Sequence, residues 1–247
     1  MSDRDQHKPR PLARRSLLKM AAAGAAAGSL PFAGAQPMEG MTTPAKQAGP
    51  GHCDSAPAVY TFLNSQEVAF LEAAVATLIP ADELGPGALE LGAVVFIDRQ
   101  LGGDYGRGDR MYLQGPFAEG TAEQGYQLRM TPAELVQAGI ADVQAHTSGK
   151  YQRRFEELSA QERAAVLSGL ETHQVSLPTV PGELFFGVLL ELTQQGFFCD
   201  PIYGGNRGKA SWKLLGFPGI GAMYADRIAP FRNQLYVSEP VSIEDLL

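Results

Sequence analysis

The chain has few of the side chains from which metal and haem sites are built. Its 247 residues include two cysteines and four histidines, and these form no Cys-x-x-Cys, Cys-x-x-Cys-His or His-x-x-x-His pattern. A Gly-x-Ser-x-Gly nucleophile elbow is also missing, and no glycine-rich loop follows a predicted strand. We therefore expect no metal, no bound cofactor and no active site in this chain.

Positive charge is scarce beyond the N-terminus. Residues 1–35 hold six of the 20 Lys and Arg but only two of the 27 Asp and Glu, which leaves 14 cationic against 25 acidic residues from position 36 onward. Affinity for nucleic acid depends on Lys and Arg that displace counterions from phosphates. With 45% hydrophobic and 19% charged residues, the composition also excludes disordered and collagen-like chains. We expect a folded protein with no nucleic-acid partner.

Residues 1–35 have the three parts of an export signal. A basic leader precedes an apolar stretch, residues 20–32, which is interrupted by Pro31 and is shorter than a membrane-spanning helix. Ala33 and Ala35 then provide a small-residue cleavage site. We expect this segment to be removed after export and not to remain as an anchor.

The leader resembles the bacterial twin-arginine signal, whose pattern is Ser/Thr-Arg-Arg-x-Phe-Leu-Lys. Ala13 and Leu17 depart from that pattern, and an ordinary secretory signal is the alternative. The resemblance implies recognition by the twin-arginine translocase and export of folded cargo. The residues that carry it are Arg14, Arg15, Leu17, Leu18 and Lys19.

Residues 36–58 contain four prolines and three glycines, which is typical of a flexible spacer. From residue 59 onward the periodicity is helical. Asn64, Thr131 and Ser159 are each followed three residues later by Glu, a pattern that predicts a capped helix start. A further helix is predicted to end at Gly102. The side chains expected to face the core are Val68, Leu71, Val75, Leu78, Val94, Ile97, Leu101, Val136, Ile140, Val143, Ala165, Val166 and Leu170.

A fifth helix, residues 182–195, has almost no polar face and is predicted to lie at the centre of the fold. Gly196 is expected to end it as a left-handed cap. No alternating strand pattern competes with these helices. The sequence therefore predicts an all-α fold over residues 59–247, a single-domain irregular bundle of about five helices with long Gly- and Pro-rich loops.

Residues 196–219, here called the turn segment, combine aromatic rings, cations and glycines. This composition is typical of the centre of a protein interface, where rigid rings and Arg dominate binding. The alternative is a loop that folds back and fills the protein's own core with these rings. The candidate interface residues are Phe197, Phe198, Cys199, Asp200, Pro201, Tyr203, Asn206, Arg207, Trp212 and Phe217.

Two stretches resemble the signature of the gluconate 2-dehydrogenase subunit 3 family. The first runs Asp-Pro-Ile-Tyr-Gly-Gly-Asn-Arg over residues 200–207 and is followed by Ser-Trp-Lys at 211–213 and Gly-Phe-Pro-Gly at 216–219. The second is Leu-Ile-Pro-Ala-Asp-Glu-Leu-Gly-Pro-Gly-Ala at residues 78–88. The resemblance covers roughly residues 62–219.

The resemblance implies a non-catalytic small subunit of a membrane-bound dehydrogenase complex. In such a complex a large subunit containing FAD oxidises the substrate, and a multihaem cytochrome c subunit carries electrons to quinone. The small subunit would export the flavoprotein with it and hold it at the periplasmic, outer face of the bacterial inner membrane. Membrane association would come through the complex.

Gluconate is the leading substrate that the resemblance implies, and fructose, sorbitol, glucose and 2-ketogluconate are the alternatives. A different class of function is a stand-alone periplasmic enzyme or ligand-binding protein with a pocket formed by Asp200, Tyr203, Asn206 and Arg207. A third is a purely structural envelope protein.

The two cysteines are Cys53 in the spacer and Cys199 in the turn segment. In an oxidising periplasm they could pair with each other, pair with a partner protein or remain free. Because Cys199 lies in the candidate interface, we hypothesise that it forms a disulfide with a cysteine of the large subunit.

Overall fold

The structure is a computed structural model that describes residues 58–118, 120–121, 124, 126–221 and 224–247. This part of the chain contains α-helices, short 3₁₀ helices and isolated β-bridges, with no strand, so the predicted all-α class is confirmed. The export-signal residues, the cleavage site, the spacer up to residue 57 and Cys53 lie outside the described residues. None of the described helices is long and apolar enough to cross a membrane.

Eight α-helices are described, and five of them correspond to the predicted ones. The α-helices are α2 Ser65–Leu78, α3 Ala93–Gly102, α4 Asp104–Arg107, α5 Pro132–Tyr151, α6 Ala160–Glu171, α7 Gly182–Phe198, α8 Ala210–Leu215 and α9 Ala225–Ile228. The 3₁₀ helices are η2 Phe155–Glu157, η3 Pro201–Tyr203, η4 Arg207–Lys209 and η5 Glu244–Leu246. The three helices that were not predicted, α4, α8 and α9, have four to six residues each.

The predicted helix starts are confirmed at three positions. Asn64, Thr131 and Ser159 are the N-caps of α2, α5 and α6, and each forms a complete capping box with the Glu three residues on. At α2, for example, the Asn64 side chain accepts hydrogen bonds from the N–H groups of Gln66 and Glu67. These caps satisfy N–H groups that have no partner within the helix.

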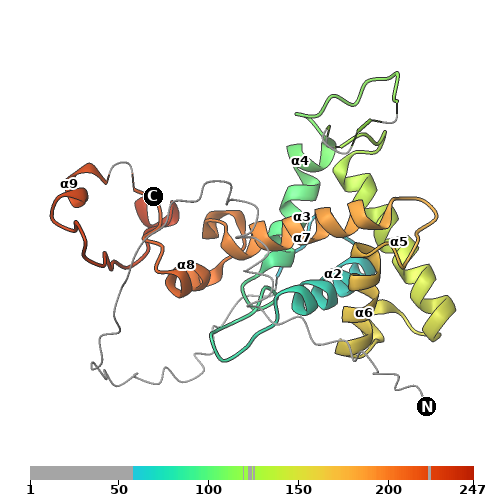
Figure 1. Ribbon diagram of the computed structural model, residues 1–247, viewed down its shortest axis with the longest axis horizontal. Helices are drawn as coiled ribbons and strands as arrows, with labels where there is room; N and C mark the ends of the chain where they lie inside the picture. Colours follow the sequence, from blue (N-terminus) through green and yellow to red (C-terminus); the bar gives the residue numbers. More distant parts are fainter. Residues whose placement is uncertain (1–57, 119, 122–123, 125, 222–223) are drawn as a thin grey trace, which may run out of the picture. The chain divides into compact units, whose positions relative to one another are not determined.

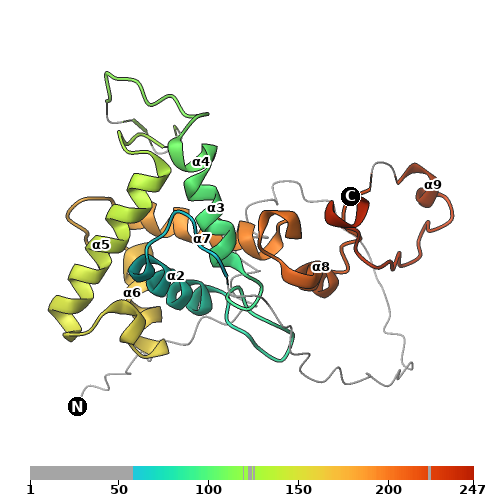
Figure 2. The ribbon, with the colours of Figure 1, turned by 180° about the vertical axis from the view of Figure 1, so that it is seen from behind.

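The central element is α7, which contacts α3, α5, α6 and α8 (Figure 1). From behind, α2 is seen in front of it (Figure 2). The Phe185 ring of α7 lies 6.4 Å from the Phe70 ring of α2, which in turn lies 4.6 Å from the Phe155 ring. All three rings are fully buried, so the core forms where α2, η2 and α7 meet.

Two details of the sequence prediction are wrong. Gly196 is an interior residue of α7, which continues to Phe198 and has Cys199 as its C-cap. A Cβ on Gly196 would lie 3.0 Å from the Ala93 Cα atom, so the glycine serves the close approach of α7 to α3 rather than a cap. Ala165, predicted to face the core, is exposed, and Leu167 on the same helix is buried.

A buried carboxylate fixes the chain that leads into α2. Asp98 on α3 is 1% exposed and accepts hydrogen bonds from the backbone N–H groups of Thr61, Phe62 and Leu63 at 2.8–3.0 Å. The Thr61 hydroxyl donates a fourth at 3.1 Å. Burial acts to raise the pKa of Asp98, but the hydrogen bonds from Leu63, Thr61 and Phe62 outweigh it and hold the pKa below its ordinary value.

The C-terminal residues return to the turn segment. The Ile220 N–H donates to the Val241 carbonyl at 2.8 Å, and the Val241 N–H donates to the Pro218 carbonyl at 3.1 Å. Residues 221–240 therefore leave and re-enter at one place, and they carry exposed apolar side chains such as Leu235 and Val237. The ends of this loop are held together by backbone hydrogen bonds.

Candidate partner interface

The turn segment is a series of short helices joined by left-handed residues. After α7 ends at Phe198, the chain forms η3, η4 and α8 in sequence. Gly204, Asn206, Gly208 and Lys209 all have positive φ, between 44° and 101°. These residues reverse the chain within a few positions, which brings it back along the end of α7.

Asn206 is the residue that holds this reversal in place. It is fully buried, and its amide Nδ2 donates to the Cys199 carbonyl at 2.9 Å. Its Oδ1 accepts from the Ser211 N–H at 3.0 Å and from the Ser211 hydroxyl at 2.7 Å. The backbone N–H of Asn206 also donates to the Gly196 carbonyl. Its side chain thus joins the end of α7 to the start of α8.

Glycine is required next to it. A Cβ on Gly205 would lie 2.0 Å from the Gly196 carbonyl oxygen and 2.8 Å from the Cys199 Sγ. Because the nearer atom belongs to the backbone of α7, a side chain at this position would push the turn away from the helix. Gly205 is therefore explained by close packing on α7, whereas Gly204 has φ 101° and lies against Val95 and Arg99 of α3.

The aromatic rings of the turn segment divide into two groups. Phe197 and Trp212 are buried, and the Trp212 indole N–H donates to the Phe198 carbonyl at 2.7 Å. Phe217 packs edge-on against Trp212 at 5.2 Å but is 44% exposed, and Tyr203 is 49% exposed. The alternative of a loop that fills the protein's own core therefore holds for Phe197 and Trp212, whereas Tyr203 and Phe217 are exposed and the interface stays a prediction.

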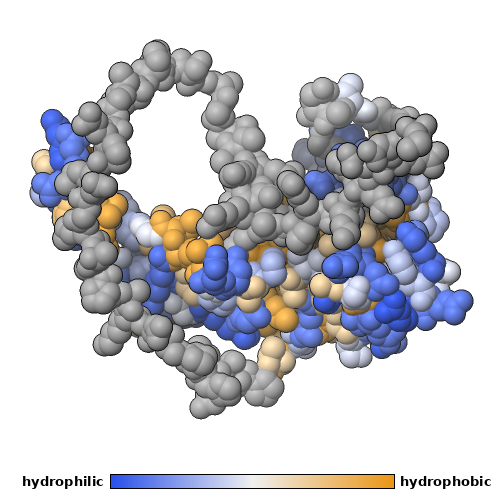
Figure 3. Space-filling view, turned by 60° about the horizontal axis from the view of Figure 1, so that its bottom comes forward, coloured by the Kyte–Doolittle hydropathy of each residue, from blue (hydrophilic) through white to orange (hydrophobic). Residues whose placement is uncertain are grey.

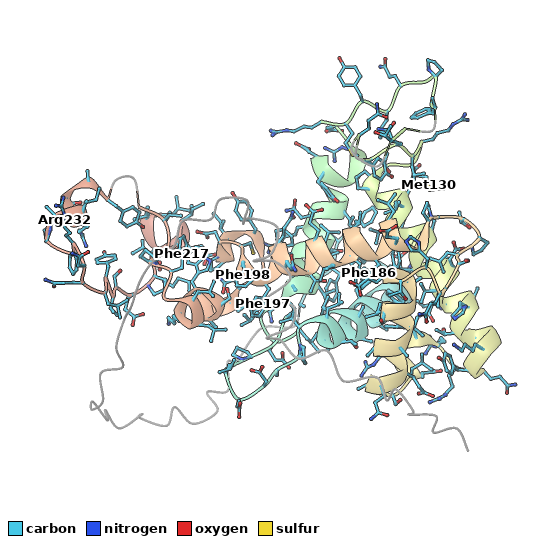
Figure 4. The ribbon with its side chains drawn as sticks, in the orientation of Figure 1. Met130, Phe186, Phe197, Phe198, Phe217 and Arg232 are labelled. Carbon is cyan, nitrogen blue, oxygen red and sulfur yellow. The ribbon has the colours of Figure 1, made fainter. Side chains whose placement is uncertain are left out.

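Figure 4 shows where several phenylalanine side chains lie along the chain. Phe197, Phe198 and Phe217 lie at the end of α7 nearest α8, whereas Phe186 lies farther along α7. Hydrophobic residues also come to the surface among hydrophilic ones on the face seen in Figure 3. The large apolar side chains of the turn segment that are exposed are Tyr203, Leu214, Leu215 and Phe217.

A hollow of about 430 Å³ lies on one side of η3. We call it the aromatic groove, and it is lined by Phe96, Gln100, Gln195, Phe198, Cys199, Asp200 and Tyr203. Cys199 is a free thiol, half-buried, with its Sγ 3.5 Å from the Gly196 carbonyl. Burial raises the pKa of the Cys199 thiol to about 11, so the isolated chain holds it protonated at neutral pH.

A second hollow, of about 300 Å³, also borders η3. We call it the arginine groove, and it is lined by Val95, Arg99, Pro201, Gly204, Gly205, Arg207, Gly208 and Glu244. Arg207 belongs to the predicted set, whereas Arg99 on α3 and Glu244 on η5 do not. Arg99 Nη1 donates to the Ile202 carbonyl at 3.1 Å, a contact between residues 103 positions apart. No local sequence signal could have identified it.

The four residues proposed as one ligand pocket do not form one. Asp200 and Tyr203 line the aromatic groove and Arg207 lines the arginine groove. Asn206 lines neither groove, and its amide is used inside the protein. Asp200 Oδ1 accepts from the Ile202 N–H and Oδ2 from the Ile243 N–H, so this carboxylate holds η3 and the C-terminal residues together.

The metal-binding side chains of the described residues do not gather into a metal site. Among them no group of three or more His, Cys, Asp or Glu side chains is placed to hold a metal ion. The two grooves combine aromatic rings, guanidinium groups and a thiol, a composition that is typical of protein interfaces.

A family model agrees with the resemblance seen in the sequence. The model described as Gluconate 2-dehydrogenase subunit 3 matches residues 65–219, which run from the first residue of α2 to the end of the turn segment. No significant match is found among curated proteins or among solved structures.

Proposed function

The chain belongs to the gluconate 2-dehydrogenase subunit 3 family, and from this premise we propose that it is the non-catalytic small subunit of a periplasm-facing, membrane-bound dehydrogenase complex. In this proposal a large subunit carries FAD and oxidises D-gluconate to 2-keto-D-gluconate, and a multihaem cytochrome c subunit passes electrons to quinone. Fructose, sorbitol, glucose and 2-ketogluconate are the alternative substrates. The family match over residues 65–219 is the observation that carries the proposal.

We further propose that this chain escorts the flavoprotein through the twin-arginine translocase and stays bound to it. The paired Arg14 and Arg15 support an export route for folded proteins. The exposed rings of the turn segment support a lasting contact with another protein. This chain has an export signal typical of folded cargo, and its described residues hold no group of metal-binding side chains. Both observations are explained if the folded cargo is the partner flavoprotein.

Replacing both Arg14 and Arg15 by lysine tests the escort role. We expect gluconate-dependent dye reduction to fall to near background in the periplasmic and membrane fractions and to appear in the cytoplasm. The matched control is Arg4→Lys with Arg10→Lys, which makes the same change elsewhere in the leader and should leave activity at the membrane. Normal export of the activity in the Arg14/Arg15 variant would contradict the proposal.

We also propose that Cys199 forms a disulfide with a cysteine of the large subunit, since it lines a groove that is open to solvent. Two thiols would give up two electrons and two protons to the periplasmic thiol oxidant. Non-reducing electrophoresis of the complex should show a covalent species containing both subunits. Cys199→Ser should abolish that species and Cys53→Ser should leave it. If Cys53→Ser removes it too, or if no larger species forms, the proposal is wrong.

A further inference from the structure

We propose that Arg99 and Arg207 form a carboxylate-binding site, and that an Asp or Glu side chain of the large subunit occupies it. The site is the arginine groove, a hollow of about 300 Å³ between α3 and the turn segment. The proposal rests on the proposed function, because it names the chemistry by which this chain recognises its partner.

Neither guanidinium has an acidic partner among the described residues. Arg107, Arg153 and Arg154 all form ion pairs with nearby Asp or Glu, whereas Arg99 and Arg207 form none. Acidic residues outnumber cationic ones in this body, so a shortage of carboxylates does not explain the difference. Two arginines left without counterions in one hollow create a positive potential that favours an anion.

The charges that face the groove are few. Glu244 on η5 is its only acidic lining residue, and it forms no ion pair with either arginine in the described part of the chain. The lining side chains therefore carry two positive charges and one negative charge. The net charge of +1 can be neutralised by one further carboxylate, which Glu244 would repel.

Both guanidinium groups lie close to glycine residues that leave room for them. A Cβ on Gly92, where φ is 82°, would lie 2.8 Å from Arg207 Nε. A Cβ on Gly204, where φ is 101°, would lie 3.1 Å from Arg99 Nη1. The two arginines thus lie directly against the main chain, and the Arg99 guanidinium is restrained by its hydrogen bond to the Ile202 carbonyl. A restrained guanidinium loses less entropy when it binds a carboxylate in a bidentate manner.

The neighbouring aromatic groove indicates that the carboxylate belongs to a protein. Pro201 lines the arginine groove, and Tyr203, two residues on in the same 3₁₀ turn, lines the aromatic groove. Tyr203 is half-exposed there beside Phe198. Exposed aromatic side chains next to arginine are the composition of interface hot spots, whereas a small free anion needs no such surface. Asp and Glu are the side chains of a protein partner that supply the matching charge.

The test uses the full chain, tagged, and purified with its large subunit from the bacterium that encodes it. The amount of FAD retained per tagged chain measures binding of the flavoprotein. It is followed as sodium chloride rises from about 0.1 M to about 1 M, because the screening length of charges falls from about 10 Å to about 3 Å over this range. We expect the double substitution Arg99→Gln with Arg207→Gln, here called the Gln/Gln variant, to weaken retention of the flavoprotein about tenfold or more at low salt. Arg99→Lys with Arg207→Lys, here called the Lys/Lys variant, should retain an intermediate amount of flavoprotein. It keeps both positive charges but lacks the planar guanidinium groups that bind a carboxylate through two hydrogen bonds.

Two controls separate charge recognition from loss of structure. Arg110→Gln with Arg129→Gln removes the same charge from exposed arginines outside the groove and should bind as wild type. Glu244→Gln should bind equally well or more tightly, since it removes the opposing charge. If the Gln/Gln variant does not fold, as judged by circular dichroism, the Lys/Lys variant and the salt dependence of the wild type decide the question.

The outcomes distinguish this inference from the proposed function. If no flavoprotein co-purifies with the wild-type chain at low salt, the proposed function itself is wrong. If the flavoprotein is retained but the Gln/Gln variant holds it as tightly as wild type, only the carboxylate site is wrong. Salt-independent retention by the wild type, or binding of free gluconate that depends on the two arginines, would also overturn it.

Discussion

Asn206→Ala is expected to lower the free energy of unfolding by about 4 kcal/mol. The substitution leaves the Cys199 carbonyl and the Ser211 N–H without their partner inside the protein, and each unpaired buried group costs about 1–3 kcal/mol. Asn206 also has φ 44° and ψ 44°, a left-handed conformation that costs alanine about 1 kcal/mol. Chemical denaturation followed by circular dichroism measures the change.

Asn233→Ala provides a matched control for this prediction. Asn233 also has a positive φ, 60°, but its side chain is exposed. Its replacement should cost about 1 kcal/mol or less, the backbone contribution alone. The difference between the two variants isolates the buried hydrogen bonds of Asn206. Equal effects would show that these hydrogen bonds do not stabilise the turn segment.

Asp98→Asn is expected to destabilise the protein by about 2–4 kcal/mol. The wild-type carboxylate accepts four hydrogen bonds, two on each oxygen. An asparagine keeps one acceptor oxygen and places its NH₂ group against two donors, which leaves them unpaired at about 1–3 kcal/mol each. Asp109→Asn, at an exposed carboxylate paired with Arg107, should change stability by about 0.5 kcal/mol or less.

The pH dependence gives a second measurement for Asp98. Its pKa in the folded protein lies below the ordinary value, as its hydrogen bonds to the Thr61–Leu63 backbone outweigh its burial. A depressed carboxylate pKa contributes stability that is complete above the unfolded pKa of about 3.9 and is lost as the pH falls through the folded pKa. The wild type should therefore lose more stability than Asp98→Asn below about pH 4. Parallel pH profiles would contradict this assignment.

The helices that the sequence predicts are those with local signals. Asn64, Thr131 and Ser159 predict their helices by capping boxes, and the near absence of a polar face predicts that α7 is central. Short elements such as α4 and α8 are too brief for a period to be detected. Gly196 was misread because the same residue type serves as a helix cap and as a spacer between packed helices, and only the position of Ala93 distinguishes the two.

Composition singles out the turn segment as a candidate interface, but it does not predict which of its rings are buried and which are exposed. Trp212 and Tyr203 are both aromatic and lie nine positions apart, yet one is buried and the other half-exposed. Their difference depends on how the chain reverses at Asn206, which is a tertiary property. Arg99 was missed for the same reason, because it meets the turn segment only through a contact that spans 103 positions.

The loop between Ile220 and Val241 begins and ends at one junction, where the Ile220 N–H donates to the Val241 carbonyl and the Val241 N–H donates to the Pro218 carbonyl. Gly219 makes this junction possible, since a Cβ there would lie 2.0 Å from the Val241 carbonyl oxygen. When the ends of a loop are fixed, doubling its length costs only about 0.6 kcal/mol of closure entropy. Insertions and deletions between the two ends are therefore thermodynamically cheap. We therefore expect changes in the length of this stretch to leave the arrangement of the helices intact.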